Sequence, residues 1–189
     1  WRSGRLLRNP ALHVESGVSF SLLDTSCITD AHLDETLMLA QLAEFRWWAG
    51  RSMLDFKFAQ GETSLQSYFV PPFAVLGKLV QVLVAIARRT LPKGEPLALI
   101  QLIVNFYKDG SSSVKPHRHR CRQVCASLGS PRDVEVEGRI ITMRHGDCLP
   151  LAGEEHAVPP TAAASAAGPR MSVCLFYGTR DEVDRGAGV

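Results

Sequence analysis

The spacing of apolar residues changes near Pro96. Before it, apolar residues recur every three or four positions, which predicts helices over about 30–48 and from Pro71 to about Arg89. The segment 53–68 between them has no clear period, and we expect a loop or a short hairpin there. After Pro96, short runs rich in β-branched and aromatic residues alternate with turn residues, a pattern typical of an antiparallel sandwich or barrel.

Eight strands are expected after Pro96. Their ranges are 97–107, 114–119, 122–128, 133–136, 139–144, 148–151, 156–158 and 171–177. Turn signals separate them, for example Asp109-Gly110 and Glu137-Gly138. The layout predicts one domain, with two helices packed on one face of a small β-sandwich. We divide it into an N-terminal extension with helices (1–95), a β core (96–180) and a tail (181–189).

Composition narrows the class of protein. The 189 residues are 46% hydrophobic and carry 21 Lys and Arg against 19 Asp and Glu, a net charge of +2. These values predict an ordered globular domain and exclude binding of nucleic acid over the whole surface. No apolar run reaches the roughly 18–20 residues of a membrane span, so we expect no membrane association and take a monomer as the default. The five cysteines are odd in number, which favours reduced thiols and an intracellular location, nuclear or cytoplasmic.

Potential metal ligands and basic residues are concentrated in the segment Lys115-Pro-His-Arg-His-Arg-Cys-Arg122. Alternate residues of a strand share a face, so His117, His119 and Cys121 are expected on one side. The arginines between them, on the other side, are Arg118, Arg120 and Arg122. Two imidazoles two residues apart can chelate a metal ion, although a solvated basic edge strand would also explain the segment.

His156 is a candidate third ligand, because a sandwich can bring its short strand beside His117 and His119. Three imidazoles suit iron, zinc, copper or nickel, and the sequence does not choose among them. His145 precedes a Gly-Asp turn, so we expect its side chain, like that of Asp147, to hydrogen bond within the turn. His13 and His32 are expected to be surface or capping residues.

The order of several motifs resembles the AlkB-like branch of the iron(II)/2-oxoglutarate oxygenases. These motifs are Asn105-Phe-Tyr107, Asp109-Gly110, His117-Arg-His119, Ser127-Leu-Gly129, His145-Gly-Asp147, His156 and Arg170-Met-Ser-Val-Cys-Leu-Phe176. The resemblance covers roughly residues 97–178. It implies a double-stranded β-helix, or jelly roll, preceded by helices, and hence an α+β fold class.

The resemblance also implies roles for individual residues. His117 and His156 would bind Fe(II), and His119 stands where the family has its carboxylate ligand. The 2-oxoglutarate cosubstrate would contact Asn105 and Tyr107, and Arg170 would pair with its distal carboxylate. Two further departures are Phe176, at the position of a second family arginine, and a short interval between His117 and His156.

The activity implied is that of a 2-oxoglutarate-dependent dioxygenase. Family members of this branch oxidise alkylated bases of DNA or RNA, and a hydroxylated N-methyl group then leaves as formaldehyde, so the implied role is that of a demethylase. Arg118, Arg120 and Arg122 could form a rim that binds phosphates, and Tyr68 could stack a flipped base. Core packing is the alternative role for the aromatic residues.

Two other interpretations stay open. The three histidines, with Gln123 in the place of a glutamate, also resemble the metal-binding motifs of cupins, which share the barrel. Arg170 and Asn105-x-Tyr107 have no role in cupins, which favours the oxygenase. A non-catalytic binding module that has lost the chemistry is the second alternative, prompted by His119 and Phe176.

Overall fold

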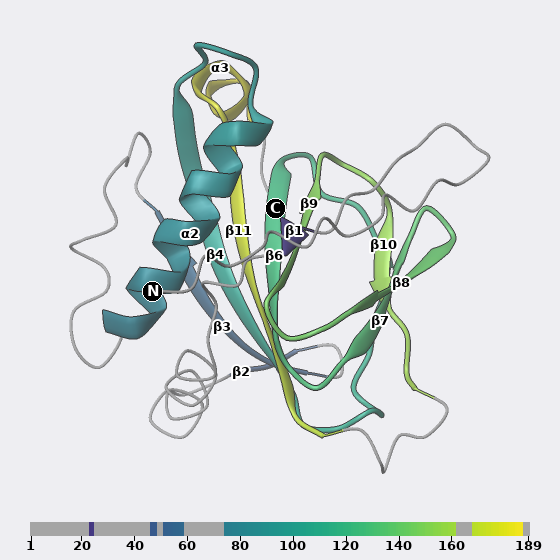
Figure 1. Ribbon diagram of the computed structural model, residues 1–189. Coiled ribbons are helices and arrows are strands. Elements are labelled where there is room, and N and C mark those ends of the chain that lie inside the picture. Colours follow the sequence, from purple (N-terminus) through teal and green to yellow (C-terminus); the bar gives the residue numbers. More distant parts are fainter. Residues whose placement is uncertain (1–22, 25–45, 49–50, 59–73, 162–167, 187–189) are drawn as a thin grey trace, which may run out of the picture.

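Two antiparallel β-sheets face each other and form the jelly roll that the sequence predicts (Figure 1). The computed structural model describes residues 23–24, 46–48, 51–58, 74–161 and 168–186. The large sheet has the order β1-β9-β6-β11-β4-β3-β2, and the small sheet has the order β5-β10-β7-β8. The strands are β1 (Leu23–Asp24), β2 (Arg46–Trp48), β3 (Arg51–Lys57), β4 (Leu97–Tyr107), β5 (Val114–His117), β6 (Arg122–Gly129), β7 (Arg132–Val136), β8 (Arg139–Met143), β9 (Asp147–Leu151), β10 (His156–Val158) and β11 (Arg170–Thr179).

Helix α2 (Ala74–Thr90) lies across the outer face of the large sheet, on the side away from the small sheet (Figure 1). Its buried stripe includes Leu79, Val80, Leu83, Ile86 and Ala87. This stripe recurs every three or four residues, as expected for a helix with one face in the core. Arg88 and Arg89 lie in its last turn, where positive charge is favourable to the helix dipole.

Strand β11 is buried on both faces. Its alternate side chains point into the hydrophobic core on one face and into a cavity on the other. Val173 and Leu175 pack in the cluster beneath α2. The residues between them, Ser172, Cys174 and Phe176, line a cavity between the two sheets. Because successive side chains of a strand point to opposite faces, one continuous apolar run supplies both layers.

A tight hairpin joins β7 to β8 in the small sheet. Glu137 and Gly138 both have positive φ, 47° and 74°, between the paired residues Val136 and Arg139. Two central residues with positive φ are the requirement of a type I′ turn, whose twist matches that of the flanking strands. The Glu137-Gly138 turn signal is therefore confirmed.

The structure corrects three expectations. Arg46–Trp48 is strand β2, so the helix expected over 30–48 does not extend to its last three residues; 30–45 lie outside the described residues. Arg51–Lys57 is a seven-residue strand paired with β2 and β4, so the segment expected as a loop or a short hairpin begins inside a strand of the large sheet. Strand β5 ends at His117 and not at residue 119.

A short helix, α3 (Arg180–Asp184), follows β11 where we expected a tail. The side chain of Thr179 caps this helix, and the Thr179 backbone N–H donates a hydrogen bond to the carboxylate of Glu182 at 2.8 Å. This reciprocal capping box has a sequence signature, Thr-x-x-Glu, that could have revealed the helix. Within the described part of the chain, no helix has both the length and the apolar character needed to span a bilayer.

Candidate metal centre and adjoining cavity

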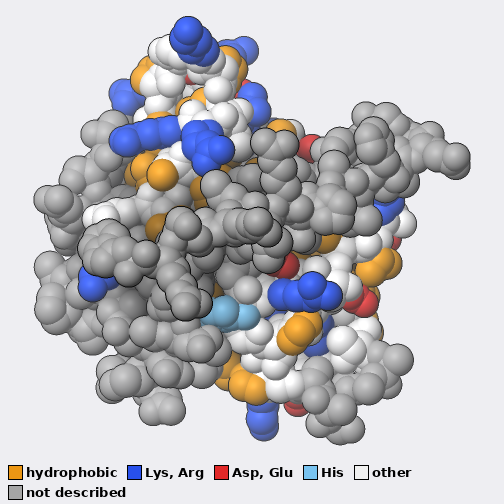
Figure 2. Space-filling model, in the orientation of Figure 1, with side chains coloured by type: hydrophobic (Ala, Val, Ile, Leu, Met, Phe, Trp, Pro, Cys, Tyr) orange, Lys and Arg blue, Asp and Glu red, His pale blue; other side chains and the backbone are white. Residues whose placement is uncertain are grey.

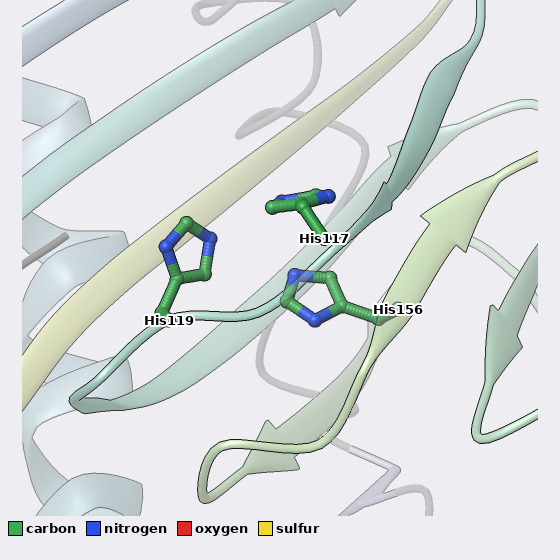
Figure 3. Close-up of side chains that lie close together, drawn as sticks. All are labelled: His117, His119 and His156. Carbon is green, nitrogen blue, oxygen red and sulfur yellow. The ribbon is translucent and has the colours of Figure 1, made fainter.

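Three histidines from two strands and a loop converge at one end of the small sheet (Figure 3). His117 ends β5, His119 lies just beyond it, and His156 begins β10. His117 and His156 are direct cross-strand partners, and their ring centroids are 4.3 Å apart. One nitrogen from each of the three rings lies within 4.8 Å of the others. The structure thus brings together the three residues that the sequence selects.

Backbone contacts fix the orientation of two of these rings. Nδ1 of His117 is 2.9 Å from the carbonyl oxygen of Lys115, and Nδ1 of His156 is 2.9 Å from that of Glu154. A carbonyl oxygen can only accept, so both Nδ1 atoms carry the proton. This leaves Nε2 of each ring with a lone pair, the arrangement that metal-ligating histidines adopt.

Gln123 contacts the metal-facing nitrogen of His156. Its Nε2 lies 2.8 Å from Nε2 of His156, and the amide is only 2% exposed. Since His156 Nε2 is the acceptor, the amide N–H donates to it, and the amide must turn away before the same lone pair can bind a metal ion. The sequence places Gln123 at the cupin glutamate position but does not show this contact, because it joins residues 33 positions apart.

His119 lies against an apolar wall. Its ring packs edge-on to Phe176, with 4.9 Å between centroids. The resemblance assigns a second arginine to the position of Phe176, and at this point the cavity has an aromatic contact with a histidine. Cys121, expected on the same face as the histidines, is buried in a cluster with Ile103, Cys174 and Phe176, three residues that line the same cavity as the histidines.

Burial lowers the pKa of His156, and the nearby His117 lowers it further. In the unfolded chain the pKa is near 6.5, so below about pH 7 the unfolded state binds the proton more readily. We therefore expect the metal-free protein to lose stability as pH falls through 6.5 toward the lower folded-state pKa. Each unit of difference between the two pKa values contributes about 1.4 kcal/mol.

Urea unfolding with EDTA present, at about pH 7.5 and about pH 5, measures this loss. A His156→Gln variant keeps a polar group beside Gln123 but cannot titrate, so it should lose less stability on acidification. An equal loss in both proteins would contradict the assignment to His156.

The histidines stand at one end of a cavity of about 560 Å³ between the sheets. This volume lies within the usual range of small-molecule sites. Histidine side chains reach the molecular surface on the face drawn in Figure 2, and all three rings are partly exposed. The wall away from them includes Asn105, Tyr107, Arg170 and Ser172.

Arg170 is a buried cation in this wall. Its side chain is 3% exposed, its Nε donates to Ser127 Oγ at 3.0 Å, and its guanidinium carbon lies 5.1 Å from the centre of the Tyr107 ring. Among the described residues, the buried Nη1 has no hydrogen-bond partner and no carboxylate pairs with Arg170. Burying a charged group that has no ion-pair partner costs free energy, so Arg170 is suited to bind an anionic ligand in the cavity.

Asn105 and Tyr107 lie on β4 beside Arg170. Arg170 and Tyr107 are register partners, as are Ser172 and Asn105. Asn105 Nδ2 donates to Ser172 Oγ at 3.2 Å, and both side chains are buried. The three residues expected to hold 2-oxoglutarate therefore form one surface.

Arg132 anchors the loop before β5, a role that the sequence did not reveal. Its guanidinium is buried and donates to three backbone carbonyls, those of Asp109, Gly110 and Ser112. Desolvation lowers the pKa of Arg132, and the charge of Arg170 adds to this effect. By fixing residues 109–112, Arg132 sets the start of the strand that carries His117.

Two arginines of the expected rim are engaged in ion pairs. Arg118 donates to both carboxylate oxygens of Glu137, at 2.9 and 3.3 Å, and Arg122 bonds Glu182 at 3.2 Å. Arg120 is exposed. Because Arg118 turns toward the small sheet and Arg122 toward α3, the three do not line one face. Tyr68 lies outside the described residues.

Asp147 hydrogen bonds within its turn as expected, because its Oδ2 accepts from the Arg144 backbone N–H at 2.7 Å. His145 does not follow the expectation, because its Nδ1 accepts from the Gly129 backbone N–H at the end of β6, at 3.1 Å, and not from its own turn. His13 and His32 lie outside the described residues.

The donor set fits a divalent transition metal. Neutral imidazoles are good ligands for first-row metals, and three of them leave coordination positions open for a ligand or for water. The unpartnered Nη1 of Arg170 in the same cavity fits the carboxylate of a small acid.

No family model and no curated protein matches the chain. Solved structures do resemble it. The non-heme alpha-ketoglutarate-dependent epimerase SnoN from nogalamycin biosynthesis matches with a TM-score of 0.60 and 15% identity, over 82% of this chain and 75% of its own. OsALKBH1 matches with a TM-score of 0.54 and 15% identity, over 83% and 97%. A 2OG-Fe(II) oxygenase family oxidoreductase from Burkholderia pseudomallei matches with a TM-score of 0.54 and 18% identity, over 85% and 84%. At these identities the likeness shows the fold.

Proposed function

We propose that this protein is a 2-oxoglutarate-dependent oxygenase whose Fe(II) is held by His117, His119 and His156. One observation carries the proposal: a buried guanidinium with an unpartnered nitrogen, Arg170, lines the same cavity as the three convergent histidines. A metal site alone would need no buried cation. A metal site joined to an anion site suits a ligand that combines a metal-binding group with a distant carboxylate.

Each residue has a separate task in this proposal. The three histidines would hold the metal, with Nδ1–H bonds fixing two of them. Arg170 would bind the distal carboxylate of 2-oxoglutarate through two parallel N–H bonds, and Asn105 and Tyr107 would line its path. The bound metal would supply the redox chemistry by which O2 converts 2-oxoglutarate to succinate and CO2 and oxidises a substrate carbon.

Replacement of the family carboxylate by His119 changes the charge of the site. Three neutral imidazoles leave the full charge of a divalent metal uncompensated, whereas a carboxylate would cancel part of it. The site should therefore attract the anionic 2-oxoglutarate more strongly.

An alkylated base of DNA or RNA is the substrate class we propose. The AlkB-like motif order supports it, and so does the position of the histidines at an open face, where a flipped base could enter. A cupin-type metalloprotein is the second candidate, favoured by the contact between Gln123 and His156. That candidate predicts metal binding without any response to 2-oxoglutarate.

Anaerobic titration with Fe(II) and 2-oxoglutarate separates the two candidates. We expect a visible metal-to-ligand charge-transfer band that appears only when both are present. Fe(II) binding without the band would favour the cupin-type protein. Failure to bind Fe(II) at all would contradict both candidates and leave a binding module.

A further inference from the structure

Two cysteine thiols lie side by side in the cavity wall. Cys125 on β6 and Cys174 on β11 are direct cross-strand partners in the large sheet. Neither cysteine is in a disulfide bond, both line the cavity, and their Sγ atoms are 2.7 Å apart. A disulfide bond is about 2.05 Å long and joins residues whose Cα atoms are about 4.4–6.8 Å apart, a range that includes the roughly 4.5–5.5 Å typical of direct cross-strand partners.

This pair is the middle of a line of polar contacts across the cavity wall. On one side, Cys125 Sγ lies 3.8 Å from Oε1 of Gln123, the amide that contacts the third histidine. On the other side, Cys174 Sγ lies 3.8 Å from Oγ of Ser172, which accepts from Asn105. The thiols therefore connect the histidine end of the cavity to the Arg170 end.

We propose that Cys125 and Cys174 are a site of reversible oxidation, which forms a disulfide when a peroxide enters the cavity. Cys125 is the more exposed of the two, so its sulfur attacks first. The O–O bond breaks, and the products are a sulfenic acid on Cys125 and water. The sulfur of Cys174 then displaces the second oxygen as water and forms the S–S bond. Two electrons pass from the sulfurs to the peroxide, and two thiols with one H2O2 give one disulfide and two waters.

Burial affects how fast the pair can react. The neighbouring Cys174 and burial raise the pKa of Cys125 well above its ordinary value, so Cys125 is a protonated thiol that reacts with peroxide more slowly than an exposed thiolate. Two other described cysteines serve as internal comparisons. Cys148 is fully buried beneath α2, on the opposite face of the sheet, and burial raises the pKa of Cys121 to about 11.

Peptide mapping tests the proposal directly, because trypsin isolates the two cysteines. Cleavage after Arg122 and Arg132 releases 123–132, and cleavage after Arg170 and Arg180 releases 171–180, each with one cysteine. The folded protein is treated with H2O2, its remaining thiols are alkylated under denaturing conditions, and the digest is analysed by mass spectrometry. We expect these two peptides to be linked, with a mass two hydrogens below their sum, and dithiothreitol to release both.

A disulfide between other cysteines would overturn the proposal. So would a result in which peroxide oxidises the other thiols while Cys125 and Cys174 stay reduced and are therefore alkylated. The Cys174→Ser variant is the matched control. It should lose the link and accumulate sulfenic acid on Cys125, which a sulfenic-acid-trapping reagent detects. Loss of the link in this variant without modification of Cys125 would contradict initial attack by that residue.

A protection experiment extends the test to the cavity, and this part rests on the proposed function. Diamide replaces peroxide, since 2-oxo acids consume peroxide. The protein is loaded with Zn(II) and with 2-oxoglutarate at a concentration of about ten times its Kd. The bound 2-oxoglutarate is expected to cover Cys125 and so to slow formation of the disulfide about tenfold. If the disulfide forms at an unchanged rate, the proposed occupancy of the cavity fails while the oxidation site stands.

Discussion

Replacing Arg170 by methionine is expected to weaken 2-oxoglutarate binding about 100-fold or more. The guanidinium would form two charge-assisted hydrogen bonds with the distal carboxylate, worth roughly 1.5–3 kcal/mol each. Stability should change little, because Arg170 is buried with an unpartnered nitrogen, and a hydrophobic side chain of similar volume replaces a buried charge at little cost. Calorimetric titration of the Zn(II)-loaded protein measures the affinity, and urea unfolding measures the stability.

The conservative variant Arg170→Lys distinguishes recognition of the carboxylate from a merely structural role. Lysine keeps the charge but loses the planar fork, so its affinity should lie between those of the natural protein and of Arg170→Met. Equal affinity in all three proteins would contradict the assigned anion site. A large loss of stability in Arg170→Met would show that Arg170 supports the fold and not the ligand.

Replacing His156 by alanine is expected to lower the affinity for a divalent metal ion by more than about 100-fold. Loss of a hydrogen bond to a ligand, with the ligand itself kept, costs roughly 10–100-fold. The substitution removes one of three donor nitrogens that lie within 4.8 Å of one another. Competition of Co(II) or Zn(II) binding against a chromophoric chelator measures the change.

Two matched variants support the interpretation of His156→Ala. His145 lies in a turn and bonds the Gly129 backbone, so His145→Ala should bind metal normally. Gln123→Leu removes an amide that donates to the lone pair of His156 that the metal would use, so this variant should not lower the metal affinity. Comparable losses in His145→Ala and His156→Ala would mean that the three-histidine cluster is not the metal site.

The β core could be predicted closely from the sequence because its pattern is local. Strands β4 and β10 have the predicted bounds, since apolar runs between turn residues define their ends. The segment Arg46–Trp48 was predicted as helix but pairs with β3. Its local period resembles a helix, and only pairing with a neighbouring strand makes it a strand.

The candidate site was predictable in its residue types but not in its contacts. His117, His119 and His156 were selected from their spacing and motif order, and they do converge. The contact of Gln123 with His156 and the pairing of Cys125 with Cys174 depend on which strands become neighbours, which sequence spacing does not encode.

The expected basic rim shows the same limit. Its arginines alternate along the sequence, yet the segment leaves the strand after His117, so the alternation does not continue. Arg118 and Arg122 then bond acids 19 and 60 positions away. An alternating pattern predicts a shared face only while the chain remains extended.

Formation of succinate from 2-oxoglutarate tests the central claim most directly. The unmodified protein, supplied with Fe(II), O2 and 2-oxoglutarate, is compared with Arg170→Met and with His119→Asp, which puts a carboxylate in the place of one imidazole. We predict that the unmodified protein forms succinate and that Arg170→Met does not. Succinate formed by His119→Asp alone would contradict the account, because the three-histidine site of the natural protein would then be inactive.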